Sequence, residues 1–125
     1  MKACRELGQH SCCQSFDQRP NVVLREKRSR YQLLNPSQKT LMHLIVDGCL
    51  IGQQEGSKCD GLIAICEDKK LILVELKGSD VKKAVMQIDA TLDHAKVRHY
   101  LGEAQVFGRI IASKAPSPAL RSSAY

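Results

Sequence analysis

Three charged residues stand at the edges of the most apolar part of the sequence. Asp60 precedes one run of hydrophobic residues, and Glu75 and Lys77 interrupt another, within CDGLIAICEDKKLILVELKG, residues 59–78. Charged groups beside a hydrophobic core cost free energy unless something compensates them. Two carboxylates that lie together repel each other unless a cation sits between them. These residue types therefore predict a divalent metal ion held by carboxylate oxygens.

The metal would suit hydrolysis of a phosphodiester. Mg²⁺ accepts oxygen ligands and keeps several waters, and the backbone carbonyl of Leu76 would add one more ligand to those of Asp60 and Glu75. A metal-bound water loses its proton more easily, and the metal neutralises charge on the scissile phosphate. Lys77 would orient that water, help to deprotonate it, or stabilise the pentavalent transition state. The competing explanation is a simple ion pair of Lys77 with one carboxylate on a half-exposed strand.

A β-hairpin would bring these residues together. Residues 60–66 and 71–77 have the composition of two strands joined by the tight polar turn EDKK. Both strands are almost continuously apolar, which predicts central strands buried on both faces. Side chains alternate along a strand, so Glu75 and Lys77 point to the same face, and hairpin pairing places Asp60 near them.

The elements after the hairpin complete the expected sheet. Residues 79–102 predict one long amphipathic helix, with Ser79 or Asp80 as its N-cap and Gly102 as its stop. Residues 104–113 predict a third buried strand. The helix makes a crossover that places its flanking strands parallel, whereas the hairpin strands are antiparallel. The expected fold class is α/β, with a mixed central β-sheet flanked by helices.

The first part of the chain has weaker patterns. Residues 1–20 show no clear period and predict an irregular N-terminal arm, so we expect a single domain over residues 21–125. A strand is indicated within residues 21–35 by their β-branched and aromatic residues. Residues 35–51 fit a helix, and they also fit a turn followed by a strand that ends near Asp47. We prefer the helix.

The charge of the chain favours a polyanionic partner. The net charge is +6, and residues 19–30 hold five arginines or lysines against one glutamate. We expect this segment to contact a nucleic-acid backbone through Arg25, Lys27, Arg28 and Arg30, although a solvated basic tail has the same composition. The chain has no Trp and only two Phe, which disfavours a surface for stacking single-stranded bases.

The cysteines predict free thiols. The chain has six cysteines, and its N-terminus lacks the apolar stretch of a secretion signal. Cys4, His10, Cys12 and Cys13 cluster in the sequence, but their spacing matches no standard zinc pattern. No apolar run is long enough to span a membrane. We therefore expect a cytoplasmic protein with no membrane partner.

Asp60, the hairpin and the ELK triplet at 75–77 resemble the motif of the PD-(D/E)XK nuclease superfamily, which has the restriction-endonuclease-like fold. The resemblance covers roughly residues 40–115. It implies that the mixed sheet is a restriction-endonuclease-like core and that Mg²⁺ or Mn²⁺ is the cofactor. It also implies that Asp60 and the ELK triplet cut phosphodiester bonds, and that Gln87, on the following helix, takes part near the active site.

The sequence departs from that family at two places. Cys59 stands where the family's Pro precedes the Asp. The family's first helix often brings a further glutamate to the metal, but the segment before the hairpin offers only Asp47, Glu55 and the more distant Glu26. We name Asp47 as the candidate for this further acidic ligand.

Three functions remain open from the sequence. The first is a metal-dependent nuclease acting on DNA. Because so small a core has little surface for reading bases, it would be a homodimer, a structure-selective nuclease, or a catalytic piece that works with a partner protein. The second is a catalytically inactive nucleic-acid-binding or assembly module on the same fold. The third is a regulatory protein whose thiols have a redox or metal role.

Overall fold

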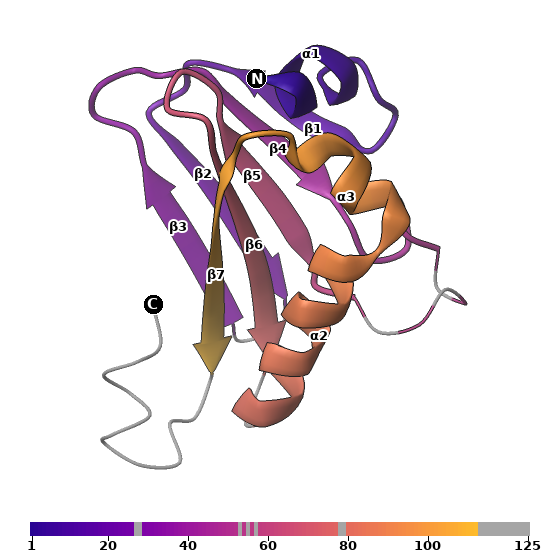
Figure 1. The fold of residues 1–125 in the computed structure, drawn as a ribbon. Coiled ribbons are helices and arrows are strands. Elements are labelled where there is room, and N and C mark those ends of the chain that lie inside the picture. Colours follow the sequence, from indigo (N-terminus) through magenta and orange to yellow (C-terminus); the bar gives the residue numbers. More distant parts are fainter. Residues whose placement is uncertain (27–28, 53, 55, 57, 78–79, 113–125) are drawn as a thin grey trace.

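A mixed five-stranded sheet with strand order β1-β4-β5-β6-β7 forms the centre of the computed structural model (Figure 1). In chain order the elements are α1 (Lys2–Leu7), β1 (Cys13–Asp17), β2 (Asn21–Glu26), β3 (Ser29–Leu34), β4 (Leu41–Ile45), β5 (Gly61–Ile65), β6 (Lys70–Lys77), α2 (Val81–Asp93), α3 (Ala95–Leu101) and β7 (Gln105–Ala112). The structure describes residues 1–26, 29–52, 54, 56, 58–77 and 80–112, and of Lys77 it describes only the backbone. The protein is therefore an α/β protein with a mixed sheet.

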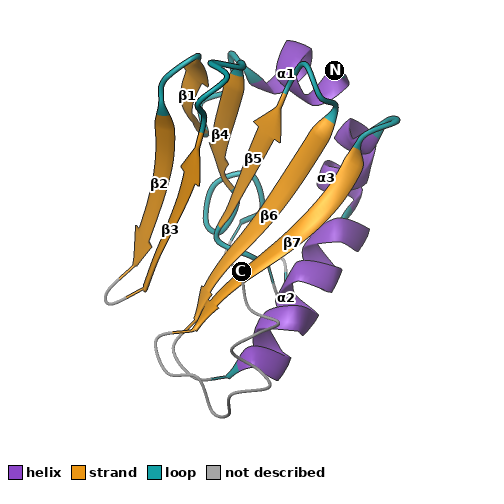
Figure 2. Ribbon diagram, turned by 90° about the vertical axis from the view of Figure 1, so that its left-hand side faces the viewer, coloured by secondary structure: helices purple, strands orange, loops and turns teal. Residues whose placement is uncertain are grey.

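The sheet is the middle of three layers. The helices lie on one face, and the separate two-stranded hairpin β2–β3 lies on the other (Figure 2). Leu62 and Leu73 face the helices, whereas Ile63 and Ile72 pack in the cluster that includes the hairpin. The prediction that β5 and β6 are buried on both faces is confirmed, and their antiparallel register follows from the turn between them.

The crossover from β6 to β7 is confirmed, because the two strands pair in parallel. The Asp80 side chain caps α2 by accepting a hydrogen bond from the Lys83 amide at 2.9 Å. The expected single helix is divided, however. His94 has extended backbone angles, φ −66° and ψ 135°, and its Nδ1 accepts a bond from the Lys96 amide, so a second helix begins there. Gly102, with φ 53°, ends this second helix.

Strand β7 differs from the prediction in its burial. Most of its side chains are half-exposed and none is buried, because β7 lies at the end of the sheet and has β6 on one side only. The segment from residue 21 to residue 34 differs as well, since it forms two paired strands where we expected one.

The preferred helix over residues 35–51 was wrong, and the alternative, a turn followed by a strand, is what the structure contains. The Asn35 side chain accepts a bond from the Lys39 amide at 3.1 Å and donates to the Lys39 carbonyl at 2.7 Å, which closes a turn. Strand β4 follows and pairs on both sides, with β1 and with β5. Pairing along both edges stabilises the strand conformation over the helix.

The predicted irregular arm over residues 1–20 was also wrong. Helix α1 buries Ala3, Cys4 and Leu7 against the core, and β1 joins the sheet beside β4. The buried residues of this short helix extend over about one helical turn. A segment this short cannot show a helical period in the sequence.

Four of the six cysteines are not free thiols. Cys4 is bonded to Cys66, and Cys12 to Cys49, whereas Cys13 and Cys59 are free. Each bridge ties the first residues of the chain to the sheet or to the segment after β4. Closing loops of 62 and 37 residues restricts the unfolded chain, which stabilises the folded state by about 4 kcal/mol per bridge in the chain-entropy account. In the part of the chain that the structure describes, no helix has the length and apolar character to cross a membrane.

Replacing Cys66 tests this pairing. In protein folded under oxidising conditions, Cys66→Ser should lower the free energy of unfolding by about 2–4 kcal/mol, because the 62-residue loop is no longer closed. The measurement is urea unfolding followed by circular dichroism. Cys13→Ser is the matched control and should change the stability by less than about 0.5 kcal/mol. Alkylation of Cys66 in the unreduced wild-type protein would contradict the pairing.

Candidate functional site

Asp60 lies where three strands meet at one end of the sheet. Its backbone N–H donates to the Val74 carbonyl at 3.0 Å, and its own carbonyl accepts from the Val46 amide at 3.0 Å. Its side-chain Oδ2 accepts from the Leu76 amide at 2.7 Å. The prediction that Asp60 lies near the strand segment that holds Glu75 is thus confirmed.

Glu75 occupies the helix-covered face of the sheet. It is 1% exposed, and it alternates with Leu76, whose side chain packs in the cluster on the hairpin side. Lys77 is the last residue of β6 and pairs with Ala112, but its side chain lies outside the described residues. The expectation that Glu75 and Lys77 share one face therefore stays a prediction.

The pKa of the buried Cys59 thiol is raised at this end of the sheet. Burial is the main cause that raises the pKa of Cys59 to about 12, and the negative charges of Glu75 and Asp60 raise it further, while a hydrogen bond with Thr91 acts the other way. Both carboxylates are therefore close enough to act on one thiol.

A polar network crosses from the sheet to α2. The Cys59 amide donates to Thr91 Oγ1 at 2.7 Å, and this hydroxyl donates to the Gln87 carbonyl at 2.8 Å. The Gln87 side chain donates through Nε2 to the Lys58 carbonyl at 3.4 Å. Its Oε1 is buried and has no hydrogen-bond partner among the residues that the structure describes. Gln87 thus lies beside the segment that leads into Asp60.

Lys58 is a charged residue that sequence reasoning missed. It is 8% exposed; its Nζ donates to the Gly56 carbonyl at 2.8 Å and lies 3.9 Å from Asp47 Oδ1. A buried lysine requires such polar partners. Nothing in the polar segment GQQEGSK distinguishes this lysine from a solvated loop residue, so the sequence carried no signal for it.

A groove of about 370 Å³ opens on the hairpin side of Asp60. Its lining includes Asp47, Asp60 and Leu76, together with Arg25 of the hairpin and His43 of β4. His43 was not predicted as a site residue. Burial, and secondarily the nearby Arg19 cation, lower the pKa of His43, which favours a neutral imidazole. The groove therefore gathers carboxylates, a guanidinium group and an imidazole around one end of the sheet.

The donor set fits a metal ion only in part. Asp60, Glu75 and the Leu76 carbonyl lie at one strand end, and one or two carboxylates with water suffice for Mg²⁺. Among the described residues, however, no three His, Cys, Asp or Glu side chains are grouped so that they could hold a metal ion. Asp47 shares the groove with Asp60, whereas Glu75 lies on the other face. Among the described residues the structure therefore gives no three-carboxylate set, and it places Asp60 in the hairpin-side groove and Glu75 on the helix-covered face.

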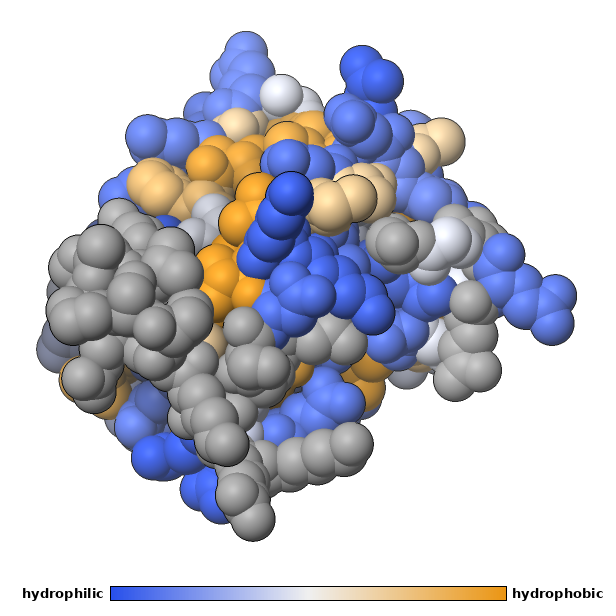
Figure 3. Space-filling view, turned by 90° about the horizontal axis from the view of Figure 1, so that it is seen from below, coloured by the Kyte–Doolittle hydropathy of each residue, from blue (hydrophilic) through white to orange (hydrophobic). Residues whose placement is uncertain are grey.

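The basic segment places two arginines opposite each other. Arg25 on β2 and Arg30 on β3 are both exposed and form a cross-strand pair near the end of the hairpin. Like charges directly opposite each other are destabilising unless an anion lies between them. Lys27 and Arg28 lie outside the described residues. Figure 3 looks onto this end of the molecule, where the described surface is largely hydrophilic with an apolar strip among the polar residues.

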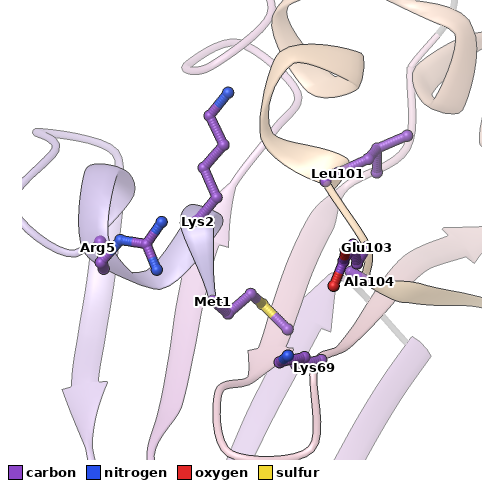
Figure 4. A pocket seen from close by; sticks show the side chains of 8 residues that line it. Met1, Lys2, Arg5, Lys69, Leu101, Glu103 and Ala104 are labelled. Atoms are coloured by element: carbon purple, nitrogen blue, oxygen red, sulfur yellow. The ribbon is translucent and has the colours of Figure 1, made fainter.

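A second hollow lies at the opposite end of the sheet, near the β5–β6 turn. It has a volume of about 230 Å³ and is lined by Lys2, Arg5, Lys69 and Glu103, among others. Its basic side chains do not converge, because Lys2 extends away from Lys69 (Figure 4). None of the predicted site residues lines this pocket.

Comparison with known proteins adds no further constraint. No protein-family model matches the chain, and neither a curated protein nor a solved structure matches it. The site is therefore argued from its own residues.

The titration of Cys59 gives a test of its burial at this end of the sheet. Between the ordinary thiol pKa of 9.0 and the folded value of about 12, the unfolded chain loses this proton and the folded chain keeps it. Stability must then fall as the pH rises through this window, by up to about 1.4 kcal/mol per pH unit. We expect urea unfolding at pH 8 to 10.5 to show this loss in the wild-type protein. Relative to it, Cys59→Ser should gain stability with rising pH, and a constant difference between the two proteins would contradict the account.

Proposed function

We propose that this chain is a metal-dependent phosphodiesterase that cuts nucleic acid, most readily DNA. The observation that supports it best is the 2.7 Å bond from the Leu76 amide to Asp60, which holds one carboxylate beside the strand segment that carries Glu75. The mixed sheet, with its hairpin and parallel crossover, agrees with the restriction-endonuclease-like core that the sequence resemblance implies.

Asp60, Glu75 and the Leu76 carbonyl would hold Mg²⁺ or Mn²⁺. The ion would ease deprotonation of the attacking water and neutralise charge on the phosphate. Because one oxygen of Asp60 is fixed by the Leu76 amide, its other oxygen has a defined direction for binding. Lys77 would orient or deprotonate the water, and Gln87 would position the segment before Asp60. Asp47 would act from the groove, outside the pair of metal-binding carboxylates.

The substrate would approach the end of the sheet where β6 ends. The end of β2 that carries Arg25 and the start of β3 that carries Arg30 lie at the same end of the molecule (Figure 2). Their opposed guanidinium groups would be stabilised by a phosphate group of the nucleic-acid backbone. Lys27 and Arg28, between them in sequence, would add to this contact.

Burial of Glu75 favours a second candidate function, an inactive nucleic-acid-binding or assembly module. With Glu75 1% exposed, solvent hardly reaches its side chain, so catalysis requires this end of the sheet to open when metal and substrate bind. An inactive module needs no such opening. The two functions share the basic hairpin and differ in hydrolysis alone.

The cytoplasmic location expected from the sequence would require the two disulfides to persist in a reducing compartment. Such bonds are more usual in oxidising compartments. A partner protein remains part of the proposal because the basic hairpin offers a small surface for reading bases.

A cleavage assay tests the proposal. The substrates are labelled duplex, single strand, flap, four-way junction and RNA, each with Mg²⁺, Mn²⁺ or EDTA. We expect metal-dependent cutting that falls about 10²–10⁴-fold in Glu75→Gln and in Lys77→Met, because each removes a group that acts on the reacting water or its metal.

Glu103→Gln is the matched control, since Glu103 is an exposed glutamate far from Asp60, and it should cut at the wild-type rate. Binding of the same substrates without cutting, unchanged in Glu75→Gln, would contradict catalysis and support the inactive module.

A further inference from the structure

Strand β7 leaves one edge of the sheet open. It is the last strand in the order β1-β4-β5-β6-β7, and among the described residues no strand pairs with its outer side. Its sequence, QVFGRIIA, has eight residues, no proline and one charge, and its register with β6 is unbroken. An exposed apolar edge of this kind recruits another strand.

The opposite edge of the sheet is protected. Strand β1 has five residues and a register irregularity between Cys13 and Ser15. It ends at Asp17, which pairs with Arg19 at 2.8 Å. Short length, irregularity and charge are the features that prevent strand addition at an edge. The contrast identifies β7 as the edge that is open to a partner.

The hydrogen bonds of β7 show which of its backbone groups face outward. The Gln105 amide donates to the Lys69 carbonyl at 2.9 Å, so Gln105 points its backbone groups toward β6. Consecutive residues alternate in this direction. The N–H and C=O groups of Val106, Gly108 and Ile110 therefore point to the open edge. The Gly108 carbonyl accepts a bond there from Arg109 Nη1 of the same chain at 2.9 Å, which pairing with a second copy would replace.

We propose that two copies of this chain join through their β7 strands, antiparallel and centred on Gly108. Gly108 then lies opposite Gly108 of the second copy, and Val106 lies opposite Ile110 of the second copy. These pairs consist of the outward-facing residues, so each exchanges two backbone hydrogen bonds. The two sheets become one continuous sheet.

The side chains select this register. It places Phe107 opposite Arg109 of the second copy, in a closely spaced pair that favours a cation–π contact. Arg109 already lies 5.5 Å from the Phe107 ring centroid within one chain. A register centred on Arg109 would set two arginines opposite each other, which is destabilising. The strand is thus complementary to itself in one register.

The helix layer offers a second contact. An apolar groove of about 380 Å³ lies between α2 and β7, with Val85, Ile88 and Ile110 in its lining. Val85 is 44% exposed and Met86 is 62% exposed. A two-fold axis perpendicular to the sheet keeps both α2 helices on the same face, beside the joined strands. Association would therefore cover apolar surface as well as the strand edge.

Sedimentation equilibrium and amide exchange of the full chain test this proposal, and neither depends on nuclease activity. We expect a mass of twice 13.9 kDa at high protein concentration. We also expect the amides of Val106, Gly108 and Ile110 to exchange at least about tenfold more slowly in the dimer than in the dilute monomer. The amides of Phe107 and Arg109, which face β6, should change much less.

Ile110→Pro should abolish the dimer, because it removes an outward N–H and leaves the bonds to β6. Ile110→Val keeps that N–H and should remain dimeric, and circular dichroism checks that both variants are folded. A monomer at all concentrations would overturn the proposal. So would a dimer in which these amides exchange freely, or protection that persists in the monomer, which would show that the same chain covers this edge.

Discussion

The arrangement at the candidate site depends on one hydrogen bond, from the Leu76 amide to the Asp60 carboxylate. Strand β5 pairs with β6 only as far as Val74, so the amide of Leu76 has no backbone partner on β5. The Asp60 carboxylate accepts the hydrogen bond of this amide instead, so the contact between the two segments continues beyond the last backbone pair. A buried amide left unsatisfied would cost about 1–3 kcal/mol, so the bond is both structural and positional. It fixes a carboxylate beside the backbone of the strand segment that carries Glu75.

The helix layer and the hairpin pack against opposite faces of the sheet at this strand end. The helix layer covers Glu75 and joins the sheet through Cys59, Thr91 and Gln87. The hairpin covers the other face and leaves a groove next to Asp60. Gly61 makes that packing possible, because a Cβ there would lie 2.5 Å from a methyl group of Leu24 on the hairpin. Charged groups are thus held at the junction of two apolar clusters.

The central hairpin and the crossover could be predicted because their signals are local and strong. Two apolar runs around EDKK and a capped amphipathic helix each specify one structure. The helix α1 and strand β4 could not, since short segments take the conformation that distant pairing stabilises. Disulfides, the buried Lys58 and the groove position of His43 depend on contacts between residues far apart in sequence. The roles of Asp60 and Glu75 were predicted from residue type and spacing, and the structure adds their positions.

Binding of Mn²⁺, followed by amide NMR, tests the central claim most directly, because Mn²⁺ accepts the same oxygen ligands as Mg²⁺ and broadens nearby signals. The account predicts that low concentrations of Mn²⁺ broaden the amide signals of Asp60, Glu75 and Leu76 first, and that excess Mg²⁺ restores them. Asp60→Asn should weaken this effect. Unchanged signals at these residues in millimolar Mn²⁺, or broadening centred elsewhere, would contradict a metal site at the end of β6.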